Sequence, residues 1–205
     1  LLGAGPMFPV APHPAAGGEA LMTALVVGLV MGLGSWLLTT LVYFFEDLFA
    51  RLPVHWMWWP ALGAVVVGIG GLIEPRVLGT GYNTIHALMN GKLFGTLLIG
   101  LLIAKTIVWA VALGSGTSGG VLAPLLIIGG SLGALLGQWM PAGDTGLWAT
   151  VGMGAMMGGT MRSPLTGMVF TMELTHEFNA MPVLFVASMV AFGTTVLILP
   201  RSILT

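Results

Sequence analysis

A glycine-rich stretch between two apolar segments decides the fold of this chain: Gly114-Ser115-Gly116-Thr117-Ser118-Gly119-Gly120-Val121-Leu122-Ala123-Pro124. Its four glycines within seven residues exclude a regular helix at this place. Where the stretch turns into the next apolar segment, the first N–H groups of a helix have no intrahelical partner and carry the positive end of the helix dipole. The hydroxyls of Ser115, Thr117 and Ser118 can add donors. The stretch therefore predicts an anion site built from neutral groups.

Two interpretations of this loop are open from its residues alone. Irregular backbone at membrane depth must either line a cavity or be buried in protein. If the loop lines a pore, neutral donors suit permeation, because a buried Arg or Lys would hold the anion too tightly to release it. If the loop is buried, it is a tight connection that lets the helices pack.

The composition places the chain in a membrane. Of its 205 residues, 57% are hydrophobic and 6% are charged, whereas a soluble domain carries about 25% charged residues. This excludes a soluble domain, a disordered chain and a nucleic-acid-binding protein, which would need a basic face. There is no cysteine, and the four histidines are scattered, so neither a metal site nor a cofactor is expected. We expect a multi-pass integral membrane protein of the plasma or inner membrane, with the lipid bilayer as a partner.

The apolar segments are uneven in length, and several are too short to cross a hydrocarbon core of about 30 Å. The charges of residues 46–51 are expected to end the first helix. Trp56, Trp58 and Trp59 follow them and predict an aromatic belt at the membrane interface. We expect an all-α membrane protein of about eight tilted, partly non-spanning helices. The second follows the tryptophans and runs to about residue 73, and the others cover residues 20–45, 82–89, 93–113, 121–139, 147–161, 164–176 and 181–199.

Short apolar segments broken by glycine and proline favour a transport protein, in which half-helices meet near the membrane midplane, over a simple bundle. Residues 1–19 are expected to form a loop, and residues 20–205 a membrane domain. Close helix contacts are predicted where glycines recur every four residues, at Gly28, Gly32, Gly129, Gly133 and Gly137.

Three motifs occur in order along the chain. The first is Gly119-Gly120-Val121-Leu122-Ala123-Pro124, the second is residues 152–167, which read GMGAMMGGTMRSPLTG, and the third is Met172-Glu173-Leu174-Thr175. In order and spacing they resemble the GGxFxP, GMGA…RxPLTG and xExT stretches of the CLC chloride channels and chloride/proton antiporters. The resemblance covers about residues 20–205.

The resemblance is to the second of the two inverted repeats of a CLC subunit. The GSGIP and GxEGP loops of the first half do not occur in this sequence, nor does the tyrosine that closes the central anion site of the family. The chain is therefore expected to be a fragment or one part of a split protein, which alone does not conduct like a complete subunit. Channel and antiporter mechanisms both stay open, since the choice depends on glutamates of the first half. The family's dimer interface implies a homodimer through residues 164–176 and 181–199.

The resemblance also implies what the glycine loop binds. Chloride or a related anion would be held by the backbone N–H groups of Val121 and Leu122. Position 122 is Leu where the family usually has Phe, but a backbone contact should survive this change. The implied anion site comprises Val121, Leu122, Gly120, Gly119 and Ser118.

Three charged residues are predicted to have structural roles. Lys105 lies inside an apolar segment, and Glu173 is the matching buried acid. Because an ion that faces lipid is costly, we expect a fixed ion pair that orients the helices, with a transport role as the alternative. Arg162 stands at a helix junction before Pro164 and is expected to cap carbonyl groups or to snorkel.

An enzyme is the competing class. Residues 116–123 fit the pattern GxSGxxxA and so resemble the rhomboid intramembrane serine proteases, in which Ser118 would be the nucleophile. Only His176 lies in the right part of the chain to act as its base, and the expected AHxxG context is absent. His176-Glu177 does not complete a zinc motif, because Ala180 stands where HExxH needs its second His. We therefore expect anion transport and no enzyme activity, with an inert membrane scaffold as a third alternative.

Overall fold

The computed structural model describes residues 6–9, 17–117, 119–140 and 143–199, and within these residues it contains helices and turns but no strand. In chain order the α-helices are α1 (Gly18–Ala50), α2 (Trp59–Ile73), α3 (Tyr82–Met89), α4 (Thr96–Gly114), α5 (Leu122–Gly137), α6 (Thr145–Thr160), α7 (Pro164–Thr175) and α8 (Met181–Ile198). Single turns of 3₁₀ helix lie at Trp56–Trp58, Pro75–Val77 and Phe178–Ala180. The predicted all-α fold with short and long helices is confirmed.

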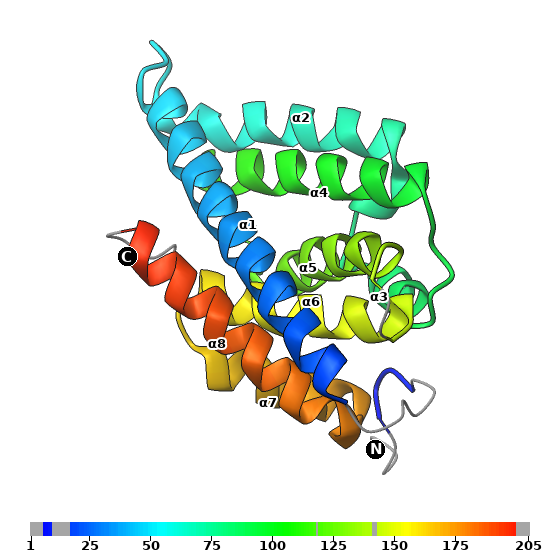
Figure 1. The fold of residues 1–205 in the computed structure, drawn as a ribbon. Coiled ribbons are helices and arrows are strands. Elements are labelled where there is room, and N and C mark those ends of the chain that lie inside the picture. Colours follow the sequence, from blue (N-terminus) through cyan, green and yellow to red (C-terminus); the bar gives the residue numbers. More distant parts are fainter. Residues whose placement is uncertain (1–5, 10–16, 118, 141–142, 200–205) are drawn as a thin grey trace.

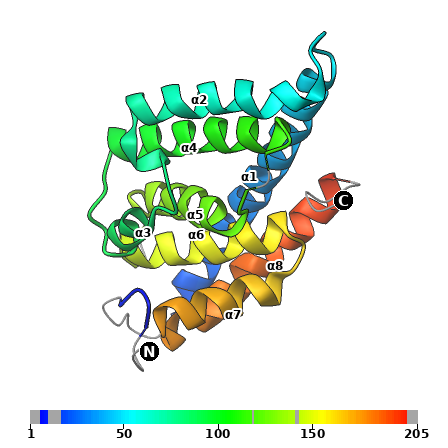
Figure 2. The ribbon, with the colours of Figure 1, turned by 180° about the vertical axis from the view of Figure 1, so that it is seen from behind.

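The helices are arranged in layers (Figure 1). Helices α2 and α4 lie side by side on one side of the molecule, α5 and α6 form the middle, and α7 and α8 lie on the other side. The long helix α1 crosses these layers and packs on α4, α6 and α8. Seen from behind, the same order holds (Figure 2). Helix α6 is at the centre, and every residue from Gly146 to Thr160 is buried.

Helix length separates two classes of element. Four segments are long and apolar enough to cross a membrane, namely Gly18–Ala50, Trp56–Ile73, Thr96–Gly114 and Phe178–Ile198. Helix α5 has 16 residues and is therefore about 24 Å long, less than the hydrocarbon core of about 30 Å. Helix α3 has only eight residues, and α7 has twelve. The prediction that several helices do not span the membrane is confirmed.

The first helix is longer than predicted. It continues through Glu46 and Asp47 to Ala50, whereas the charges at these positions were expected to end it. Both carboxylates are exposed, so they end the part of α1 that can lie in hydrocarbon. They do not interrupt the hydrogen bonds of the helix. Charged side chains in the last turns of a long helix limit how far the helix can enter the membrane. They do not determine the residue at which the helix ends.

A short segment before α1 is tied to the rest of the fold. The side chain of Phe8 is buried, and its ring lies 6.0 Å from the ring of Tyr82 on α3. Its backbone N–H donates to the carbonyl oxygen of Leu174 near the end of α7 (3.0 Å). Of the loop predicted over residues 1–19, positions 1–5 and 10–16 lie outside the described residues, as do positions 200–205 at the other end of the predicted domain.

Glycines let the helices approach closely where the sequence predicted. A Cβ atom added to Gly129 on α5 would lie 2.5 Å from the carbonyl oxygen of Gly152 on α6. One turn later, a Cβ at Gly133 would collide with the carbonyl oxygen of Trp148. On α1, Gly28 and Gly32 make equally close approaches to α8. The predicted close contacts at these glycines are confirmed, and they are contacts to backbone or to the stiff base of a side chain.

The substitution Gly133→Ala tests this packing. The added methyl group must displace the backbone of α6, so we expect it to lower the stability by about 1–3 kcal/mol. The matched control is Gly193→Ala on α8, where a Cβ meets no atom within 4 Å. The measurement is the midpoint of thermal unfolding in detergent. Equal midpoints for the two variants would contradict the close α5–α6 contact.

Candidate anion site

Helix α4 ends in a glycine turn that satisfies its last carbonyl groups. Gly116 has left-handed backbone angles (φ 77°) that suit glycine, and its N–H donates to the carbonyl of Leu113 (2.9 Å). The N–H of Thr117 donates to the carbonyl of Ala112 (3.3 Å). This pair of bonds is a Schellman motif, in which a left-handed residue stops the helix and pairs its free carbonyls. The chain thus leaves α4 without unpaired acceptors at these positions.

The hydroxyl groups at the start of the loop are engaged inside the protein. Ser115 is buried, and its Oγ donates to the carbonyl of Ala112 (2.7 Å). The Ser115 and Thr117 hydroxyls lie 3.0 Å apart, and because the single proton of Ser115 goes to Ala112, Thr117 donates to Ser115. The expectation that these two hydroxyls add donors for an anion is therefore wrong, because both complete the end of α4. Ser118, the third predicted hydroxyl, lies outside the described residues.

Among the described residues, the amino end of α5 has N–H donors without a partner inside the helix. Val121 occupies the position before the helix and makes no side-chain cap. The first described bond of this helix is from Leu125 N–H to the Val121 carbonyl (3.2 Å), and Pro124 has no N–H, so the N–H groups of Leu122 and Ala123 have no intrahelical acceptor.

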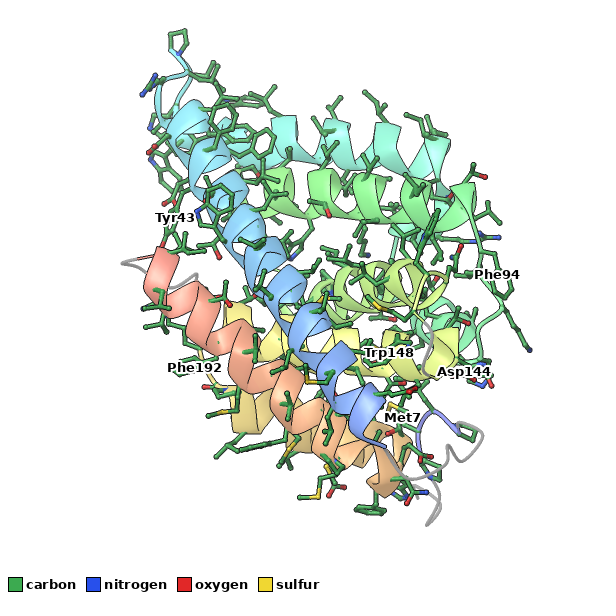
Figure 3. The ribbon with its side chains drawn as sticks, viewed as in Figure 1. Met7, Tyr43, Phe94, Asp144, Trp148 and Phe192 are labelled. Carbon is green, nitrogen blue, oxygen red and sulfur yellow. The ribbon has the colours of Figure 1, made fainter. Side chains whose placement is uncertain are left out.

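This end of the helix is also open to its surroundings. Gly119, Gly120 and Leu122 are exposed, and Cβ atoms at the two glycines would meet nothing within 4 Å. Helix α6 shows the contrast, since the Asp144 Oδ1 at its amino end, labelled in Figure 3, accepts the N–H of Leu147 (2.8 Å). The structure therefore groups four predicted residues, Gly119, Gly120, Val121 and Leu122, at an accessible helix end with no side-chain cap.

Lys105 is buried, as predicted, but it does not bind Glu173. Its side chain is 5% exposed, and Nζ donates to the carbonyl oxygens of Val77 (2.6 Å) and Gly79 (3.4 Å). Helix α4 and helix α7, which carry the two charges, lie in different layers with α5 and α6 between them (Figure 1). The predicted ion pair is therefore wrong. The acceptors of Lys105 are carbonyl groups of the irregular segment between α2 and α3, where Pro75 and Gly79 interrupt regular pairing.

The other two predicted charges have different surroundings. Glu173 lies in the last turn of α7 and is exposed, so the prediction of a buried acid at this position is wrong. Glu177, two residues after α7, is the buried carboxylate. Arg162 lies between α6 and α7 with a left-handed backbone (φ 56°), and its guanidinium donates to the carbonyl of Leu199 at the end of α8 (2.7 Å). The prediction that Arg162 caps a carbonyl group is confirmed.

Together, the described groups place N–H donors without a fixed positive charge at the start of α5. The unused donors are at the start of α5, whereas Lys105 is nine residues before Gly114, about 14 Å away along the axis of α4. Its ammonium group is engaged with backbone carbonyls of residues 77–79. Backbone donors without a fixed counter-charge hold an anion weakly enough to release it.

Comparison with known proteins decides the family. The chain matches the family model described as "Voltage gated chloride channel" over residues 1–196. It belongs to the CLC family of voltage-gated chloride channels. The family expected from the three sequence motifs is thereby confirmed, and with four helices that can cross a membrane this CLC chain is a multi-pass integral membrane chain.

Two curated CLC relatives are named "Voltage-gated ClC-type chloride channel ClcB". The one from Citrobacter koseri is 33% identical and the one from Salmonella typhimurium 32% identical, each over 175 residues. The matched region covers 82% of this chain and 41% of each relative. The chain therefore spans about two fifths of the length of these curated relatives.

Two solved CLC structures have a similar fold. A slow cyanobacterial Cl⁻/H⁺ antiporter superposes with a TM-score of 0.84 at 22% identity, covering 96% of this chain and 48% of that one. A CLC-type fluoride/proton antiporter superposes with a TM-score of 0.81 at 20% identity, covering 93% of this chain and 48% of that one. At these identities the likeness shows the fold, and it matches this chain to about half of a CLC subunit.

The protease alternative gains no support from these findings. The family model and the relatives are CLC proteins, and Ser118, the nucleophile that a protease would need, lies outside the described residues. His176, its only candidate base, is exposed at the end of α7 and stacks on Phe178 with ring centroids 6.5 Å apart. The inert scaffold has no observation in its favour either.

Replacing the buried lysine of this CLC chain should destabilise it. Lys105→Met removes the donor for the carbonyls of Val77 and Gly79, and leaving the carbonyl of the buried Val77 unpaired costs about 1–3 kcal/mol. The control is Lys92→Met, because Lys92 is exposed and a surface change is expected to stay within about 0.5 kcal/mol. Chemical unfolding of both variants in detergent measures the difference. If Lys105→Met were as stable as the control, the hydrogen bonds from Lys105 to residues 77 and 79 would not stabilise the fold.

Proposed function

We propose that this chain forms one half of a CLC anion pathway in the plasma or inner membrane and binds chloride through the first N–H groups of α5. The supporting observation is the accessible end of α5 at Gly119-Gly120-Val121-Leu122, which has no side-chain cap. The two curated relatives described above are named as chloride channels, and this favours chloride as the anion.

The chemistry of the loop supports permeation over permanent binding. With the hydroxyls of Ser115 and Thr117 bonded to α4 and to each other, we propose two backbone ligands for the anion. They are the N–H of Leu122, which has no intrahelical acceptor, and the N–H of Val121 just before the helix. These donors gain strength from the dipole of α5, but they carry no full charge. The Leu122 side chain is 40% exposed at the same helix end, where the CLC motif usually has Phe, and either residue presents the same N–H group.

A complete pathway needs a second wall opposite this helix end. The solved CLC structures are about twice as long as the matched part, and the start of α5 is open in this chain. We therefore propose that the complementary CLC repeat covers the loop and supplies the remaining ligands. The activity belongs to the assembled protein, in which flux through the two repeats passes the amino end of α5.

We also propose that two such assemblies form a homodimer through residues 164–176 and 181–199. Large apolar side chains are exposed on both helices of this pair, including Leu165 and Val169 on α7 and Phe185 and Met189 on α8. Glu173 lies one turn beyond Val169 on the same exposed face, and a position near the end of α7 lets its carboxylate remain in contact with water.

An amide-to-ester substitution at Leu122 tests the anion site. The ester deletes one N–H and keeps the side chain, and the loss of a hydrogen bond to a charged ligand costs about 1.5–3 kcal/mol. We therefore expect chloride affinity to fall about ten- to hundred-fold. The variant Leu122→Pro also deletes the N–H, but Val121 has α-helical backbone angles (φ −91°, ψ −33°), which a following proline disfavours.

The measurement is chloride binding by calorimetry on this chain assembled with the first half of a CLC relative, with circular dichroism to check the fold. Leu122→Phe is the matched control, because it changes the side chain and keeps the donor. An ester variant that binds chloride as tightly as the control would remove this loop from the anion path. Proton uptake recorded during chloride efflux from vesicles would distinguish an antiporter from a channel.

A further inference from the structure

The turn between α1 and α2 is an ordered, outward-facing structure that the anion site does not use. We call residues 46–59 the hairpin tip. It comprises the charged last turn of α1, a short connection and the 3₁₀ turn Trp56–Trp58. In Figures 1 and 2 the tip stands clear of the remaining helices at the upper end of α1. Three consecutive side chains, Trp56, Met57 and Trp58, are 65%, 66% and 63% exposed.

Contacts within the tip orient these side chains. The indole Nε1 of Trp59 donates to the carbonyl of Val54 (3.2 Å), and its ring lies 6.4 Å from that of Phe49 on α1. The Nδ1 of His55 accepts the N–H of Met57 (3.4 Å). Trp59 therefore packs against the other residues of the tip, whereas the side chains of Trp56 and Trp58 are exposed.

The chemistry of the tip matches the headgroup region of a bilayer. Its charged residues Glu46, Asp47 and Arg51 are exposed beside the tryptophans. Charges exclude the tip from the hydrocarbon core, and they are depleted at the centre of protein interfaces. Tryptophan, with an apolar ring and a polar N–H, is enriched at the depth where hydrocarbon meets water.

The length of α1 places the tip at that depth. Its 33 residues give a helix of about 50 Å, which still projects about 38 Å along the membrane normal at a tilt of about 40°. This exceeds the hydrocarbon core of about 30 Å, so α1 must leave the core. Its last turn, with Glu46 and Asp47, is suited to be the part that leaves.

The tip is also connected to the glycine loop. A Cβ at Gly114, the last residue of α4, would lie 2.6 Å from the Cβ of Phe45 on α1. A Cβ at Gly63 on α2 would lie 2.7 Å from the Cβ of Ser115. The two helices that meet at the tip thus hold the start of the loop between them.

We propose that the hairpin tip is an anchor in the lipid headgroup region, with Trp56 and Trp58 as its contacts, and that it fixes the depth of the glycine loop in the membrane. The first part stands on the tip alone. The second part rests on the proposed function, because the glycine loop is the proposed anion site. Neither part requires that chloride binds.

The absence of cysteine from the sequence makes the test direct, because a single added cysteine is the only site for a spin label. The 205-residue chain carrying Met57→Cys is labelled in phosphatidylcholine vesicles, and collision with oxygen and with a water-soluble nickel chelate gives the label depth. We expect about 15 Å from the bilayer centre, the edge of the hydrocarbon core. Leu33→Cys, near the middle of α1 and 41% exposed, should read deep in the core. Val54→Cys is a second reporter on the tip in case Met57→Cys alters it.

Two results would overturn the anchor. A label at position 57 that meets only the nickel chelate would place the tip in water, and a label that meets neither agent would mean that protein covers it. The double variant Trp56→Ser/Trp58→Ser should move the label away from the core edge. Trp139→Ser, at an 84% exposed tryptophan after α5, should leave its depth unchanged. If the double variant and Trp139→Ser changed the depth of the label equally, that result would also overturn the anchor.

A label at Gly119→Cys, where an added side chain meets no atom within 4 Å, reports the loop in the same variants. If the tip anchors the loop, the label at 119 moves together with the label at 57. A tip that moves while the loop keeps its depth would overturn the connection and leave the anchor standing. Chloride binding is measured separately, so a failure of the anion site would not change either depth.

Discussion

A backbone polar group in a membrane must find its partner inside the protein, and the interruptions of this fold follow from that constraint. The end of α4 is completed by a Schellman turn and by the Ser115 hydroxyl. The carbonyls at positions 77 and 79 receive the ammonium group of Lys105, and the carbonyl of Leu199 receives the guanidinium of Arg162. The amino end of α5 differs from these places, because Val121 makes no side-chain cap and Gly119, Gly120 and Leu122 are exposed. This contrast is the reason for proposing an anion site at this end of α5.

The position of these donors depends on packing that side chains cannot easily adjust. Helix α5 lies against α6 through Gly129 and Gly133, where backbone meets backbone. Helix α6 is buried from Gly146 to Thr160 and contacts α1, α7 and α8 as well. Since cores of this density do not deform gradually, the start of α5 has a fixed place relative to the centre of the molecule. Glycine therefore has two roles here: it leaves open space at positions 119 and 120, and it lets α5 pack closely on α6 at positions 129 and 133.

The sequence predicts this fold well where one physical rule dominates, and poorly where two groups must be matched across the structure. The apolar lengths and the glycine and proline breaks were sufficient to place the short helix at residues 82–89 and the break before α5, and the family motifs locate the loop. The pairing of Lys105 was wrong, because nothing in a linear sequence shows that α5 and α6 separate it from Glu173 or that carbonyls of residues 77 and 79 lie beside it. The hydroxyls of Ser115 and Thr117 were misassigned for a similar reason, since a helix end competes with a ligand for the same donors. The end of α1 was misplaced because charge limits immersion in lipid, whereas helix termination depends on backbone geometry.

The buried Phe8 has a consequence for the order in which the chain is assembled. Its N–H bonds to Leu174, and its ring lies beside Tyr82, so Phe8 depends on partners that lie far from it along the sequence. Contacts between residues this far apart in sequence close late, because the intervening chain must first be ordered. Until α7 is in place, the N–H of Phe8 lacks its acceptor at Leu174. The segment that carries Phe8 therefore reaches its final position only after α3 and α7 have come together.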